Sequence, residues 1–281
     1  MLDVAPKGAY DHGDTDSAAT PATGGVDRAG TNDLARLAEL VRGAGSVVAL
    51  TGAGISVPSG IPDFRSPGGG LWETVDPMRV AHIDAFRSDP VRFWSFYGER
   101  FATLGAKQPN GAHRALVAME ATGMLEAVIT QNIDMLHRKA GARDPIEVHG
   151  SIASCRCPRC AGSVPLAQVR MRLQGDPDGV PRCEGCRGPL KPEVVLFGEL
   201  LPERALARAR ELCEGADLLL CIGSSLEVHP VAGLPLLTHA AGGTVAIITQ
   251  GPTPLEELAG VRLRGDVVDE LQALAGALGL G

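Results

Sequence analysis

The feature that most constrains this chain is a set of four cysteines in two Cys-x-x-Cys pairs, Cys157 with Cys160 and Cys183 with Cys186. Each pair brings two thiolates to one ion, and the 22 residues between the pairs match the spacing of a zinc ribbon. Free or disulfide-paired cysteines are the alternative, but two such pairs rarely coincide at this distance by accident. Four sulfur ligands leave no open position for water or substrate, so we expect one structural zinc ion per chain and catalytic chemistry elsewhere.

Composition excludes several classes of protein. A net charge of -7 over 281 residues argues against a dedicated nucleic-acid binder, and no apolar run approaches the roughly 18 to 20 residues of a membrane span. The N-terminus lacks the pattern of a signal peptide, and seven cysteines, an odd number, suit a reducing compartment. We therefore expect a cytoplasmic protein with no nucleic-acid or membrane partner. The sequence does not indicate its oligomeric state.

Apolar runs of strand length predict the fold. They occur at 46–50, 125–130, 194–197, 218–222 and 245–249, with helical stretches between most of them. A hydrophobic content of 44% with only 4% aromatic residues fits the aliphatic core of such a fold. Strands that alternate with helices indicate an α/β protein with a Rossmann-like, doubly wound parallel sheet.

Two segments interrupt this alternation and divide the chain into predicted domains. We assign 31–63, 123–153 and 192–281 to the large nucleotide-binding domain, and expect Thr31 or Asn32 to cap its first helix. A helical and cofactor-loop insertion at 64–122 and the zinc ribbon at 154–191 would form a smaller domain. Residues 1–30 have almost no large apolar side chains, which predicts a disordered tail.

The first predicted strand runs into a glycine-rich turn that contains Gly52, Ala53, Gly54 and Ser56. Glycines in such a strand-to-helix turn allow the backbone to approach a pyrophosphate closely. Val57 stands where the third glycine of the usual dinucleotide motif would fall, so this loop alone is a weak signal.

Further motifs, in a fixed order, make the resemblance specific. These are GAGIS at 52–56, SGIPDFR at 59–65, TQNID at 130–134, HG at 149–150, the two cysteine pairs, FGE at 197–199 and GSS at 223–225. In this order the chain resembles the sirtuins, of bacterial type, from about residue 32 to residue 274. The resemblance implies an NAD-dependent protein lysine deacylase. Its co-substrate would be NAD, its partners proteins or peptides with acylated lysines, and its products nicotinamide, O-acyl-ADP-ribose and free lysine.

The resemblance also implies roles for single residues. His149 would be the general base that relays a proton from the ribose hydroxyls, a task that suits an imidazole near neutral pH. Asn132, counted with His149 as catalytic, would hold the nicotinamide side of NAD. The remaining cofactor contacts would come from Gly52, Ala53, Gly54, Ser56, Asp63, Phe64, Arg65, Gln131, Asp134, Gly223, Ser224, Ser225, Thr249 and Gln250. Thr249 and Gln250 are a departure, because the family usually places an adenosine-binding Asn at this turn.

The acylated peptide would lie as an added strand beside Val195, Phe197, Gly198 and Glu199. Tyr97 and Arg100 have the Tyr-x-x-Arg spacing that recognises a succinyl or malonyl carboxylate in one class of sirtuins. Three positions apart on a helix, they share a face, although amphipathic helices often carry this pair without such a role. Acetyl-lysine is the default substrate without this clamp.

Two other functions stay open at this point. A sirtuin-like protein mono-ADP-ribosyltransferase would use the same NAD site, and a non-enzymatic NAD-sensing protein would keep the fold alone. A zinc-dependent base deaminase is excluded, because it needs His-x-Glu and one open metal position, whereas Gly150 and Ser151 follow His149.

Overall fold

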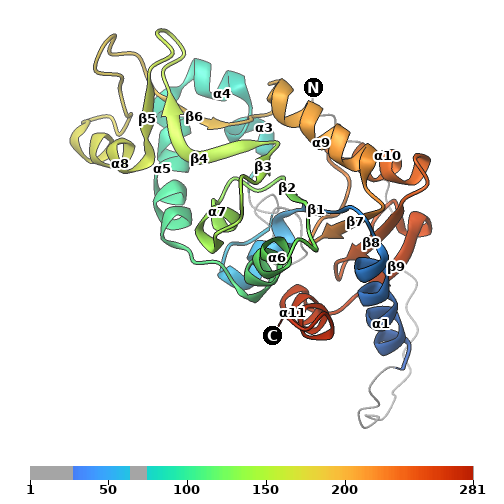
Figure 1. Ribbon diagram of the computed structural model, residues 1–281. Coiled ribbons are helices and arrows are strands. Elements are labelled where there is room, and N and C mark those ends of the chain that lie inside the picture. Colours follow the sequence, from blue (N-terminus) through green and yellow to red (C-terminus); the bar gives the residue numbers. More distant parts are fainter. Residues whose placement is uncertain (1–27, 64–74, 281) are drawn as a thin grey trace, which may run out of the picture.

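The computed structural model describes residues 28–63 and 75–280. Its main sheet has six parallel strands in the order β3-β2-β1-β7-β8-β9 (Figure 1). These strands are β1 (Val47–Thr51), β2 (Ala127–Thr130), β3 (Ile146–Glu147), β7 (Leu218–Ile222), β8 (Thr244–Ile248) and β9 (Ala259–Leu263). The strand order reverses between β1 and β7, and open sheets of this kind bind ligands at the carboxyl ends of the strands at such a point. The predicted doubly wound parallel sheet is confirmed.

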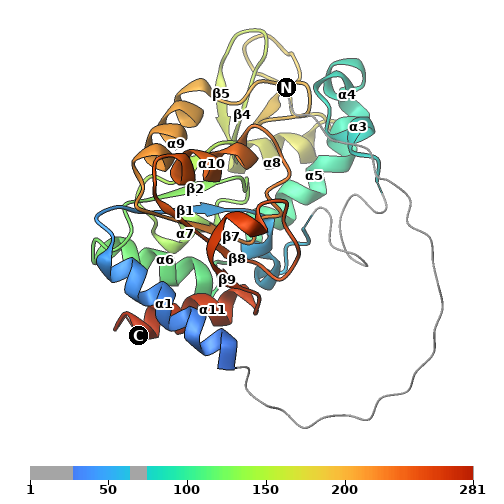
Figure 2. The same cartoon turned by 90° about the vertical axis from the view of Figure 1, so that its right-hand side faces the viewer.

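Helices cover both faces of this sheet (Figure 2). On one face lie α1 (Arg28–Gly43), α6 (Gly111–Ala121) and α11 (Val267–Ala277), and on the other α9 (Glu203–Gly215) and α10 (Leu234–Ala240). Short helical segments follow several strands: η1 (Ala53–Ser59), α7 (Leu136–Ala140), η2 (Val231–Gly233) and η3 (Glu256–Leu258). All residues of β1 and β7 are buried, which explains why both strands are uninterrupted apolar runs.

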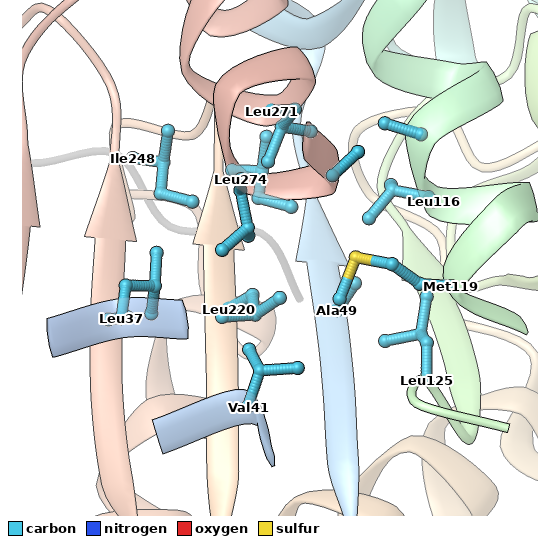
Figure 3. Close-up of a cluster of buried hydrophobic side chains, with 14 of the residues drawn as sticks. Leu37, Val41, Ala49, Leu116, Met119, Leu125, Leu220, Ile248, Leu271 and Leu274 are labelled. Carbon is cyan, nitrogen blue, oxygen red and sulfur yellow. The ribbon is translucent and has the colours of Figure 1, made fainter. Parts of the chain in front are cut away.

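The core on the first face is almost entirely aliphatic (Figure 3). Leucines and a methionine from the three helices pack over small and branched residues of the strands: Leu37, Leu116, Met119, Leu271 and Leu274 over Ala49, Leu220 and Ile248. The loops of the site start from the carboxyl ends of these strands.

A smaller domain contains the zinc segment and the helical insertion. Its three-stranded antiparallel sheet has the order β5-β4-β6, formed by β4 (Gly150–Arg156), β5 (Ser163–Pro165) and β6 (Lys191–Val194). Its helices are α3 (Pro77–Val80), α4 (Ile83–Ser88), α5 (Pro90–Ala106) and α8 (Leu166–Gly175). Phe93, Trp94 and Phe101 of α5 share one buried core with Cys157 and Cys183. The indole Nε1 of Trp94 donates a hydrogen bond to the Leu190 carbonyl at 2.9 Å, so the two insertions are packed together.

The prediction that 194–197 adds a strand to the parallel sheet was wrong. The strand in this region is β6 (Lys191–Val194), which pairs antiparallel with β4 in the small sheet. An apolar run predicts a strand but not its partner strand. Here the partner is β4, which starts directly after His149 and lies beside β6. A side chain at Gly150, whose φ is +74°, would collide with the Glu193 carbonyl, so the glycine permits this close pairing.

The start of the first helix also differs from the prediction. Helix α1 begins at Arg28 rather than at Thr31 or Asn32, so 28–30 are helical and not part of a tail. The rest of the predicted tail, 1–27, lies outside the described residues. The strands β3 and β9 were not predicted, and the domain limits stay a prediction. None of the helices within 28–63 and 75–280 combines the length and apolarity that crossing a membrane requires.

Candidate active site

A cavity of about 530 Å³ lies between the carboxyl edge of the main sheet and the small domain. It is lined from the large domain by the turn after β1 and the segment after β2, and from the small domain by α5 and the segment after β6. Ten of the predicted site residues line it: Ala53, Ser56, Tyr97, Arg100, Gln131, Asn132, Asp134, His149, Val195 and Phe197. The structure therefore brings these predicted residues, from both domains, together around one cavity.

His149 lies in this cavity, between the end of β3 and the start of β4. Its Nδ1 is 3.0 Å from the Gln131 carbonyl oxygen, which accepts a hydrogen bond and has none to donate. We therefore assign the proton to Nδ1, which leaves a lone pair on Nε2. Nε2 is buried and has no hydrogen-bond partner among the described residues. Burial lowers the pKa of His149, against the opposing effect of the Gln131 hydrogen bond, so the ring is a neutral base at neutral pH.

Ser56 links Asn132 and Asp134, two further polar side chains of the cavity. Its Oγ donates to Asp134 Oδ2 at 2.6 Å and accepts from Asn132 Nδ2 at 3.1 Å. Asn132 Nδ2 also reaches the Gly52 carbonyl at 3.0 Å, and Asp134 Oδ1 accepts from the Leu136 N–H at 2.8 Å. Burial raises the pKa of Asp134, and the Ser56 hydrogen bond is the largest effect in the other direction. The network fixes the orientation of Asn132 and Asp134 before any ligand binds.

The glycine-rich turn packs directly against the end of β7. A Cβ on Gly54 would lie 2.8 Å from Gly223 Cα, and Gly223 itself has a φ of +58°. The N–H groups of Gly52 and Gly54 donate to the carbonyls of Ile222 at 2.9 Å and Gly223 at 2.8 Å. These two donors are thus used within the protein. The glycines also allow the two strand ends to approach closely.

The other predicted cofactor residues that the structure describes do not line the cavity. Gln131 Nε2 donates to Ser224 Oγ at 3.0 Å, and the Leu226 N–H donates to the same oxygen at 3.2 Å. Ser225 is half-buried, and Thr249 and Gln250 directly follow β8. Asp63 is half-buried outside the cavity lining, and Phe64 and Arg65 lie outside the described residues.

The predicted peptide-binding segment is tied to the small domain. The N–H of Phe197 donates to the Ala81 carbonyl and its carbonyl accepts from the Ile83 N–H, both at 2.9 Å. Gly198 has a φ of +84° and packs on His82. Glu199 accepts from the Leu196 N–H at 2.9 Å and forms an ion pair with Lys191 at 2.8 Å. Both backbone groups of Phe197 and of Leu196 are therefore used within the protein, since the Glu199 N–H also donates to the Leu196 carbonyl at 3.0 Å.

Tyr97 and Arg100 lie on α5 and both line the cavity. The Tyr97 ring stacks on Phe101 with centroids 5.1 Å apart, and burial raises the pKa of its phenol. The Arg100 guanidinium lies 3.8 Å from the centre of the Phe96 ring and donates from Nη1 to the Phe96 carbonyl at 3.1 Å. The aromatic ring and this carbonyl fix the guanidinium at the cavity wall.

Sequence reasoning missed several residues of the cavity wall. Ile61, Ala81, Lys107 and Ile133 line it as well. Ile61 and Ile133 fall inside the SGIPDFR and TQNID motifs, which could have identified them. Ala81 and Lys107 follow α3 and α5, and no motif marks them.

The four cysteines of the two pairs converge in the small domain. Their sulfur atoms all lie within 4.8 Å of one another, with Cys157 Sγ 3.3 Å from Cys186 Sγ and Cys160 Sγ 3.5 Å from Cys183 Sγ. Zn–S bonds of about 2.3 Å in a tetrahedron place sulfur atoms about 3.8 Å apart, so the set fits one zinc ion.

The two halves of the cluster have the same backbone form. Ala161 and Arg187 both have a φ of +59°, and their N–H groups donate to the Cys157 and Cys183 carbonyls. Cys155 is buried in the core of the small domain and is not among the four clustered cysteines.

A Rossmann-like sheet, a four-cysteine cluster in a smaller domain and a cavity between the domains that contains a half-buried histidine place this chain among α/β proteins with an interdomain active site. The model of the Sir2 family matches residues 52–230 of this chain, well over half of its length. The chain therefore belongs to the Sir2 family, the sirtuins, and the predicted family is confirmed.

Named relatives and a solved structure agree with this membership. The chain is 45% identical to an NAD-dependent protein deacetylase of Caldivirga maquilingensis over 77% of this chain and 82% of the relative. It is 44% identical to NAD-dependent protein deacetylase 1 of Geobacillus kaustophilus over 80% of this chain and 91% of that relative. A structure of a Sir2 variant with a deacetylated p53 peptide and 3′-O-acetyl-ADP-ribose has a TM-score of 0.83, 39% identity, and coverage of 88% of this chain and 98% of that one.

Proposed function

We propose that this chain is an NAD-dependent protein lysine deacylase that transfers the acyl group of an acylated lysine to the ADP-ribose part of NAD. The relatives named above are NAD-dependent protein deacetylases, and the structural neighbour holds a deacetylated peptide with acetyl-ADP-ribose. The enzyme class predicted from the motifs thus agrees with the family.

The observation that carries the proposal is the buried Nε2 of His149, which has no hydrogen-bond partner in the described part of the chain and lies in a cavity shared by both domains. Bound NAD supplies an electrophilic ribose carbon that can take up the acyl oxygen. Nε2 of His149 accepts a proton from a ribose hydroxyl, and the Gln131 carbonyl keeps the accepting nitrogen turned into the cavity. Asn132 and Asp134, held by Ser56, orient the nicotinamide end.

The acyl preference of this enzyme is a second part of the proposal. Tyr97 and Arg100 line the same cavity as His149, which supports a carboxylate clamp for succinyl or malonyl groups. Among the residues that the structure describes, Arg100 donates one hydrogen bond, from Nη1 to the Phe96 carbonyl, which leaves other guanidinium donors for a carboxylate. Acetyl-lysine remains the substrate if the clamp is absent.

We also propose a cytoplasmic enzyme that acts on acylated proteins or peptides and has neither nucleic acid nor membrane as a partner. None of the seven cysteines forms a disulfide in the structure, and four of them cluster as a zinc site requires, which supports a reducing compartment. The net charge of -7 supports the absence of a nucleic-acid partner.

The test is a product analysis. The protein is incubated with NAD and a panel of acetyl-, succinyl- and malonyl-lysine peptides, and the products are identified by mass spectrometry. O-acyl-ADP-ribose establishes the deacylase, ADP-ribosylated protein establishes the transferase alternative, and NAD binding without either product establishes the sensing alternative. His149→Ala should abolish deacylation, whereas His239→Ala, on the exposed end of α10, serves as the matched histidine control.

A further inference from the structure

The turn after β8 is the part of the site that departs from the family pattern. Thr249 and Gln250 stand where an adenosine-binding Asn is usual. The turn lies at the carboxyl edge beside β7, because the Gly223 N–H donates to the Ile248 carbonyl at 2.9 Å. Gln250 is exposed and Thr249 is half-buried. Whether this turn can replace the side-chain amide of that Asn depends on which hydrogen-bond donors it directs toward the ligand.

An arginine from the neighbouring strand holds this turn by its carbonyl groups. Arg262 lies on β9, which pairs with β8, and only 12% of its side chain is exposed. Nη1 donates to the Thr249 carbonyl at 2.5 Å and to the Leu263 carbonyl at 2.8 Å, and Nη2 donates to the Gly251 carbonyl at 2.7 Å. One guanidinium thereby fixes the carbonyls on both sides of Gln250.

The hydrogen bond from Arg262 to the Thr249 carbonyl also fixes the direction of the following N–H group, that of Gln250. In a trans peptide the carbonyl and the following N–H point in opposite directions. Because Arg262 draws the Thr249 carbonyl toward β9, the N–H of Gln250 points away from β9. Within the described part of the chain this N–H makes no hydrogen bond.

We propose that Arg262 is a positioning residue for the adenosine end of NAD: it fixes the Thr249–Gln250 turn so that the Gln250 N–H and the Thr249 hydroxyl serve as donors to the adenosine ribose. This inference rests on the proposed function, since it requires NAD to occupy this edge. Arg262 does not line the cavity that contains His149, so it acts through the turn.

The chain offers a matched control for a purely structural role. Arg262 lies 3.7 Å from Glu256, and Arg264 contacts the same carboxylate at 2.9 Å. Arg264 is 55% exposed, and no hydrogen bond from it to a carbonyl of the turn is present among the described residues. Arg264→Met therefore removes a partner of Glu256 but keeps the hydrogen bonds from Arg262 to the Thr249 and Gly251 carbonyls.

The experiment measures ADP-ribose binding by calorimetry, together with the KM values for NAD and acetyl-lysine peptide. For Arg262→Met we expect the Kd for ADP-ribose and the KM for NAD to rise about fivefold to tenfold, the effect of losing ordered hydrogen bonds. The peptide KM and kcat should stay within about twofold of the unchanged protein. The Kd of Arg262→Lys for ADP-ribose should lie between those of Arg262→Met and the unchanged protein. Arg264→Met should bind ADP-ribose like the unchanged protein. Thr249→Ala should weaken ADP-ribose binding with little change in Tm, and it keeps the test valid if Arg262→Met does not fold.

Unchanged ADP-ribose binding in Arg262→Met, or an equal loss in Arg264→Met, would overturn the proposal. So would unchanged binding in Thr249→Ala. Weakened ADP-ribose binding in Arg262→Met by a protein without deacylase activity would support the positioning role while rejecting the proposed function. No binding of ADP-ribose by the unchanged protein would reject both.

Discussion

Ser56→Ala tests whether the buried polar network is as tightly linked as its distances indicate. Ser56 is 1% exposed, and its hydroxyl both donates to Asp134 and accepts from Asn132. Alanine keeps the Cβ and adds no clash, so the change removes the two hydrogen bonds alone. Asn132 keeps the Gly52 carbonyl as a partner, whereas Asp134 Oδ2 loses its donor.

The expected cost follows from leaving a buried carboxylate oxygen without a donor. Such a loss costs about 1–3 kcal/mol, and we expect about 2 kcal/mol in the free energy of unfolding. For domains of roughly this size each kcal/mol lowers Tm by about 2–4 °C, which gives a loss of about 4–8 °C.

The pH dependence identifies Asp134 as the cause. Burial raises the folded-state pKa of Asp134 above 3.8, and the Ser56 hydrogen bond opposes this effect, so Ser56→Ala raises it further. A raised carboxyl pKa contributes stability that is fully present below the unfolded pKa and is lost as the pH rises through the folded pKa. The deficit of Ser56→Ala should therefore be largest above the folded pKa and shrink as the pH falls toward 3.8.

The assay is a series of denaturant unfolding curves across this pH range, with Ser225→Ala as the control. Ser225 lies half-buried at the same edge of the sheet. A deficit that equals the control, or one that stays constant with pH, would refute the reasoning.

Three further predictions concern catalysis, specificity and the metal. Because burial lowers the pKa of His149, the acid limb of kcat/KM should lie below the ordinary value of 6.5, and a pH profile with its midpoint at or above 6.5 would contradict this. Arg100→Met should lower desuccinylation about tenfold or more and leave deacetylation nearly unchanged, as measured by kcat/KM on matched peptides; equal losses would mean that Arg100 supports the fold. Cys157→Ser should lower both the zinc content, measured by elemental analysis, and Tm, whereas Cys155→Ser should keep the zinc; equal zinc loss would show a wrong ligand set.

The sequence predicted the main sheet well because its strands are buried on both faces. The run 218–222 became β7 (Leu218–Ile222) without change, and 46–50 and 245–249 each shifted by one residue to β1 and β8. The run 194–197 failed because apolar character says nothing about the partner strand, which here is β4. The edge strand β3 has only two residues, too few for any periodic signal.

The site shows the same division between local and tertiary signals. Motif residues such as Asn132, Asp134 and His149 could be identified because their spacing is local, and the structure places them around one cavity. Ala81 reaches that cavity only through its pairing with Phe197, a contact between segments more than a hundred residues apart, so sequence could not reveal it. Arg262 likewise acts through carbonyl groups, whose positions follow from strand pairing and not from residue type.

The four-cysteine cluster is connected to the cavity through side-chain packing, although none of the four cysteines lines the cavity. Cys157 and Cys183 are buried in the same core as Phe93 and Trp94 of α5, and this helix presents Tyr97 to the cavity. The opposite wall, with Asn132, starts from the main sheet, whose aliphatic cores are separate from that of the small domain. We therefore expect loss of the metal to loosen the wall of the cavity that α5 forms before the wall that carries Asn132. An ion held by the four cysteines would thus stabilise one side of the cavity, while the cores of the main sheet stabilise the other side independently.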